Sequence, residues 1–167
     1  MENPFESNPV KRPTFLTIVC ILTFIGSGWG VLSNLFSLFT AGIMDSMVQT
    51  EQYTSLVNEI EEGEGPAFFA SYISSSIATL QATFLHAREI AITNLVLNVI
   101  SLLGAMLMFQ LRRFGFYLYA AAQILLLFVL PYFAGFNFYV MTMMLFSGIF
   151  SLLFLVFYTV NLKYMVK

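Results

Sequence analysis

Charged residues are scarce in this 167-residue chain. Only 10% of its residues are Asp, Glu, Lys or Arg, whereas soluble domains carry about 25%. The chain is therefore not an ordinary soluble domain. Its net charge of −2 at pH 7 also argues against nucleic-acid binding, because phosphate recognition needs clustered Lys and Arg. With a single cysteine, Cys20, it can form neither an internal disulfide nor a cysteine-based metal site.

Apolar sequence is abundant instead, with hydrophobic residues at 59% of positions. Four runs reach the roughly 20 apolar residues that a helix needs to cross a bilayer. They cover about 14–44, 90–110, 114–133 and 138–162, and none contains a charged residue or a histidine. The sequence predicts an all-α polytopic membrane protein with these four spans, made of a polar tail (1–13) and one membrane domain (14–167). The first run is too long for a cleaved signal peptide, so we expect it to stay as an anchor.

The cations set the expected orientation. Six of the seven Lys and Arg residues fall on one side of a four-span threading, and only Arg88 falls on the other. Because cytoplasmic loops carry the excess of Lys and Arg, we expect both termini to be cytoplasmic. Treating the uncharged segment 67–85 as a fifth span would split the cations three to four and remove this bias. Its many Ser and Thr residues also make it too polar, so we expect it to lie outside the membrane.

The connector between the first two spans, about 45–89, carries a helical pattern. Large apolar residues recur in it at steps of four, four, three and four, which gives one helical stripe: Phe69, Ile73, Ile77, Leu80 and Phe84. A shorter stripe precedes the turn signal Gly63–Pro66. We expect an extracytoplasmic helical hairpin, with 67–85 running unbroken into span two, and a partner contact on its stripe. The alternative is that the stripes lie flat on the outer leaflet, where the connector's acidic charge is less suitable.

Small residues follow one face of span one. Gly26, Gly30, Ser33 and Ser37 recur at helical spacing, and span two has a comparable face of Asn94, Asn98 and Ser101. Helices in lipid associate by close backbone approach at such residues. We expect these two faces to form a seam that gives the asparagine amides hydrogen-bond partners. The alternative is that the glycine face forms a seam with a second copy of the chain or with a partner protein.

Groups that carry chemistry are missing from the spans. They contain no ionisable side chain of the kind that marks proton relays and ion pathways. His86, the only histidine, has no second ligand or nucleophile beside it in the sequence, so we expect no catalytic site, no metal and no cofactor. The neutral residues Asn34, Asn94, Asn98 and Gln123 would favour transport if they converged on one wet cavity. They would favour a scaffold if they paired between helices.

The stretches "RPTFLTIVCILTFIGSG" and "YTVNLKYM" resemble small, uncharacterised four-span bacterial membrane proteins. This resemblance implies the cytoplasmic (inner) membrane of a bacterium and implies no activity. We expect a non-enzymatic accessory or scaffold subunit whose partners are the lipid bilayer and other integral membrane proteins, or further copies of the chain. The alternative is a small oligomeric channel or transporter for a neutral or weakly charged solute.

Overall fold

The structure is a computed structural model that describes residues 13–48 and 67–165. Its α-helices are α1 (Thr14–Val48), α3 (Ala67–Leu85), α4 (Ala87–Phe109), α5 (Phe114–Ala134) and α6 (Phe138–Asn161), followed by a short 3-10 turn, η1 (Leu162–Tyr164). The described residues contain no strand. The predicted all-α class is confirmed.

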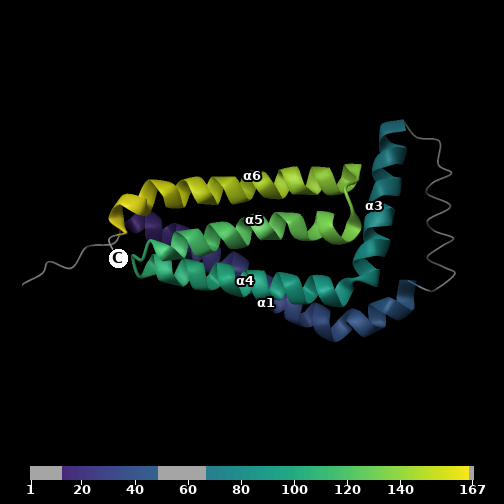
Figure 1. The fold of residues 1–167 in the computed structure, drawn as a ribbon, viewed down its shortest axis with the longest axis horizontal. Helices are drawn as coiled ribbons and strands as arrows, with labels where there is room; N and C mark the ends of the chain where they lie inside the picture. Colours follow the sequence, from purple (N-terminus) through teal and green to yellow (C-terminus); the bar gives the residue numbers. More distant parts are fainter. Residues whose placement is uncertain (1–12, 49–66, 166–167) are drawn as a thin grey trace, which may run out of the picture.

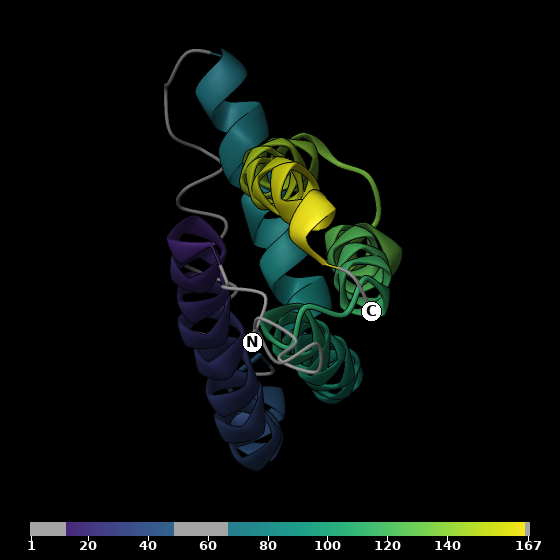
Figure 2. The ribbon, with the colours of Figure 1, turned by 90° about the vertical axis from the view of Figure 1, so that its left-hand side faces the viewer.

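Four of these helices are long and apolar enough to cross a membrane: α1 over Thr14–Thr40, α4, α5, and α6 with η1. Within the described residues, the expectation of four helices that could cross a membrane is confirmed. Figure 1 shows them running side by side, and Figure 2 shows α1 tilted against the other three. The pairs α1–α4 and α4–α5 pack most extensively, whereas α6 packs more sparsely.

The links between α4, α5 and α6 are short and have defined ends. Leu111 adopts a positive φ of 63° in the first link, and Gly135, with φ of 74°, ends α5. Asn137 then caps α6, because its side chain accepts a hydrogen bond from the backbone N–H of Val140 at 2.9 Å. These turns make α4, α5 and α6 antiparallel neighbours.

Helix α3 differs from the expectation. It runs across one end of the bundle instead of continuing α4 (Figure 1). The helix is interrupted at His86, so the prediction that 67–85 runs unbroken into span two is wrong. Packing against the end of α6 explains the break, because the Asn137 amide donates to the Thr79 hydroxyl at 2.8 Å. The first limb of the expected hairpin falls largely in 49–66, outside the described residues, and α3 itself takes the crosswise course.

Two apolar clusters fill the bundle, one toward each end. The larger surrounds Cys20, Met108, Tyr119 and Tyr158 near the end opposite α3. The smaller joins Ile90, Leu97 and Val129 on the α3 side. A layer of polar side chains lies between these two clusters.

Candidate functional site

A chain of hydrogen bonds joins all four long helices in the middle of the bundle. The hydroxyls of Ser27 on α1 and Ser101 on α4 lie 3.1 Å apart. Gln123 of α5 donates from Nε2 to the Ser101 Oγ at 3.3 Å. Ser151 of α6 donates to the Gln123 Oε1 at 3.1 Å. Because an unpaired amide or hydroxyl is costly away from water, this layer fixes the register of four otherwise apolar helices.

A second polar contact joins α1 to α6 nearer the end opposite α3. The hydroxyls of Thr23 and Tyr158 lie 2.7 Å apart, and the Tyr158 hydroxyl donates to the backbone oxygen of Val19 at 3.3 Å. The ring of Tyr119 packs edge-on against Tyr158, with centroids 5.1 Å apart. Phe15 packs similarly on Phe157. The contacts made by Phe15, Val19 and Thr23 lie in the first third of α1, so α1 and α6 are joined at this end.

A notch of about 280 Å³ lies beside the hydrogen-bonded chain. Its lining comes from all four long helices and mixes hydroxyl and amide groups with apolar side chains: Leu22, Thr23, Gly26, Ser27, Asn98, Tyr119, Gln123, Leu126, Ser147, Phe150, Ser151 and Phe154. None of these residues is ionisable at neutral pH. The notch can therefore offer hydrogen bonds but no charge.

The small residues of α1 have different surroundings. Gly30 lies against Asn98, and a Cβ at Gly30 would meet the Asn98 Cγ at 2.8 Å. Gly26 has no heavy atom within 4 Å of such a Cβ and faces the notch instead. Ser33 is exposed and Ser37 half-buried, and both bond to carbonyls of their own helix. Among these four small residues of α1, Gly30 is thus the one that approaches α4 closely.

The asparagines bond mainly within their own helices. The Asn98 amide donates to the backbone oxygen of Asn94, which is half-buried, at 2.8 Å. The Asn34 amide donates to the backbone oxygen of Gly30 at 2.6 Å. Asn34 lines a separate cavity of about 200 Å³ with Thr83 and Phe84. Asn98 and Gln123 therefore line the same notch, whereas Asn34 lines another cavity. Gln123 forms hydrogen bonds to side chains of two other helices.

A close backbone-to-backbone contact between α4 and α5 escaped sequence reasoning. Gly104 of α4 and Gly115 of α5 face each other, and a Cβ on Gly104 would lie 2.8 Å from the backbone nitrogen of Tyr119. A Cβ on Gly115 would lie 2.5 Å from the Gly104 oxygen. A partial signal was present, because both glycines lie near the short link between antiparallel spans, five residues before the end of α4 and one residue after the start of α5. Sequence position alone does not pair them, because their distances from the link are unequal.

The stripe on α3 has a mixed exposure. Phe69 is 59% exposed and Leu80 is 43% exposed, whereas Ile73, Ile77 and Phe84 are half-buried. The bundle is contacted by a neighbouring face of α3, through the buried Thr79 and through Phe68 and Tyr72, whose rings pack on Phe138. Part of the stripe is therefore left uncovered by the helices that the structure describes.

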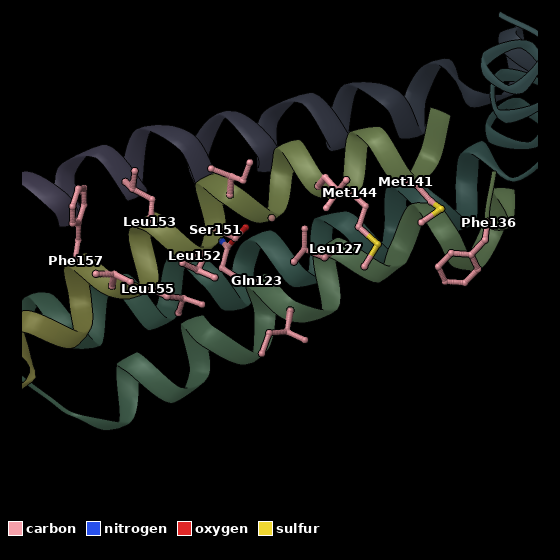
Figure 3. A pocket seen from close by; sticks show the side chains of 15 residues that line it. Gln123, Leu127, Phe136, Met141, Met144, Ser151, Leu152, Leu153, Leu155 and Phe157 are labelled. Atoms are coloured by element: carbon pink, nitrogen blue, oxygen red, sulfur yellow. The ribbon is translucent and has the colours of Figure 1, made fainter. Parts of the chain in front are cut away.

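A wide apolar groove of about 790 Å³ separates α5 from much of α6 (Figure 3). It is lined by side chains such as Leu127, Met141 and Met144, with Gln123 and Ser151 at its floor. The groove explains why α6 is the least buried of the four membrane-spanning candidates, with 6% of its most apolar stretch buried.

The described residues include no cluster of three or more metal-ligating side chains. His86 lies at the α3–α4 corner, where its Nδ1 is 3.1 Å from the backbone oxygen of Ala82 and its ring packs on Phe133. No protein-family model, curated protein or solved structure matches this chain.

Proposed function

We propose that this protein is a non-enzymatic accessory or scaffold subunit that binds another integral membrane protein. The observation that carries the proposal is the uncovered part of the α3 stripe, on which the large apolar side chains of Phe69 and Leu80 are more than two-fifths exposed. Exposed apolar surface next to polar residues is typical of protein-contact sites.

The polar residues of the spans support a scaffold better than a channel. Gln123 is engaged by both Ser101 and Ser151, which belong to other helices. Asn34 lines a different cavity from Asn98. Apolar clusters lie on both sides of the polar layer, so the layer does not continue as a polar path along the bundle.

In this proposal both termini face the cytoplasm and α3 lies on the extracytoplasmic side of a bacterial inner membrane. The cation distribution supports this orientation, because the α4–α5 link, which contains Arg112 and Arg113, and η1, which contains Lys163, lie at the end opposite α3 (Figure 1). The backbone oxygen of Met165 accepts a hydrogen bond from Arg113 Nε at 2.5 Å, which holds the C-terminal end near these cations.

The test is the substitution Leu80→Glu, which places a charge on the exposed part of the stripe. Ala78→Glu is the matched control, because Ala78 is exposed on the same helix but lies off the stripe. After gentle extraction from native membranes, wild type and Ala78→Glu should migrate in size analysis with a defined partner. Leu80→Glu should migrate without it. If wild type runs alone or as a homo-oligomer, the partner proposal is wrong, and solute flux in liposomes would then favour the channel.

A further inference from the structure

The polar notch is accessible from the side of the bundle. Two of its lining residues, Leu22 on α1 and Phe150 on α6, are 51% and 55% exposed. Toward one end it is lined by Tyr119 of the cluster around Tyr158, and on the α3 side lies the cluster of Leu97 and Val129. A molecule that reaches the notch through its side opening would come from the hydrocarbon that surrounds the helices.

The notch also lies near the middle of the spans. Gln123 is the tenth residue of the 21-residue α5, so at about 1.5 Å per residue it lies near half the length of that helix. Phospholipid headgroups lie at the edges of a hydrocarbon core about 30 Å thick. Their charged groups therefore do not reach this depth, and no ionisable side chain is present to pair with them.

The hydrogen-bonding capacity of the notch is only partly used. The Ser147 hydroxyl is exposed and makes no hydrogen bond within the described part of the chain, although most other Ser and Thr residues bond a carbonyl of their own helix. The Asn98 amide makes one local bond. A hydroxyl group on a ligand matches such a lining, because it both donates and accepts a hydrogen bond.

We propose that the notch binds the hydroxyl-bearing end of an uncharged membrane lipid, with hydrogen bonds to Ser147 and Asn98 and the hydrocarbon chain left among the surrounding lipids. Diacylglycerols and long-chain alcohols share this chemistry. The inference is independent of the scaffold proposal, because it concerns a site within the spans and can be measured on the purified protein without any partner.

The experiment uses photoactivatable lipids in phosphatidylcholine nanodiscs that contain the purified full chain. One probe is a diacylglycerol with its reactive group close to the hydroxyl, and a second is a long-chain alcohol of the same design. The controls are the same diacylglycerol with its hydroxyl acetylated and a photoactivatable phosphatidylcholine. Labelled peptides are mapped by mass spectrometry. We expect the hydroxyl-bearing probes to label the α1 and α6 walls of the notch at least tenfold more than either control.

Two glycines provide matched variants. A leucine at Gly26 would fill the notch, whereas Gly28, which equally has no atom within 4 Å of an added Cβ, does not line it. We expect Gly26→Leu to reduce labelling of the notch at least tenfold and Gly28→Leu to leave it unchanged. Ser147→Ala, a small change at an exposed site, should reduce labelling several-fold and serves if Gly26→Leu fails to fold.

The two hydroxyl probes distinguish the source. Labelling of the notch by the diacylglycerol probe alone would identify its ligand as a glycerolipid. Labelling by both the diacylglycerol and the long-chain alcohol would identify the hydroxyl as the group that the notch recognises. Equal labelling by the acetylated control would overturn the proposal. So would a cross-link between two copies of the chain through the notch residues, because a second copy would then be the occupant.

Discussion

Substituting Gly104 by alanine tests whether close backbone approach holds α4 against α5. The added Cβ would lie 2.8 Å from the Tyr119 nitrogen and 2.9 Å from the Gly115 oxygen, where ordinary contacts begin at 3.4 Å. The helices must therefore separate locally by about 0.6 Å, the difference between 3.4 and 2.8 Å. Both neighbours are backbone atoms of a helix, so neither can rotate away as a side chain would.

The magnitude follows from three contributions. Overpacking costs about 1–3 kcal/mol. The Gln123–Ser101 hydrogen bond, formed about one turn away at 3.3 Å, would lengthen beyond hydrogen-bonding range and lose about 0.6 kcal/mol. Alanine regains about 1 kcal/mol of helix propensity. The control Gly28→Ala has this gain without any contact within 4 Å. The two variants should therefore differ by about 2–4 kcal/mol, the sum of the first two contributions.

The assay is reversible unfolding in mixed micelles, followed by circular dichroism, with wild type, Gly104→Ala and Gly28→Ala measured side by side. We expect Gly28→Ala to be at least as stable as wild type and Gly104→Ala to be clearly less stable. If Gly104→Ala matched Gly28→Ala, the α4–α5 contact would be looser than described, and the reasoning from close approach would be refuted.

Three further predictions concern other parts of the chain. In the same assay Gly30→Ala should lower the stability of the protein less than Gly104→Ala does, because the close neighbour of Gly30 is an asparagine side chain that can rotate. An equal loss of stability in the two variants would contradict this prediction. Thr79→Val should remove the hydroxyl that accepts a hydrogen bond from the Asn137 amide, and so raise the rate of amide hydrogen exchange in α3 but not in α4. An unchanged rate in α3 would show that this hydrogen bond does not hold α3 in place. In a Cys20→Ala background, Gly135→Cys should react with a membrane-impermeant reagent in intact cells and Gln110→Cys should not; the reverse result would invert the proposed orientation.

The α3 break shows where sequence reasoning was incomplete. No glycine or proline separates 67–85 from span two, so local propensity favours one continuous helix. The structure instead interrupts the helix at His86, and α3 runs across the end of the bundle (Figure 1). In this position Thr79 reaches Asn137, and the rings of Phe68 and Tyr72 pack on Phe138. These partners are more than 50 residues away in the chain. Their influence on the helix direction has no counterpart in the local pattern.

The sequence by itself determined the helical class and the four apolar spans, because bilayer thickness and the cost of burying charge act on each segment separately. Short links also determined that α4, α5 and α6 are antiparallel neighbours. Only the tertiary structure decided that Gln123 joins Ser101 to Ser151, that Gly104 meets Gly115, and that Gly26 faces a notch while Gly30 packs on Asn98. The physical reason is that the rotation and tilt of a membrane helix depend on the surfaces of its neighbours, which no single helix sequence specifies.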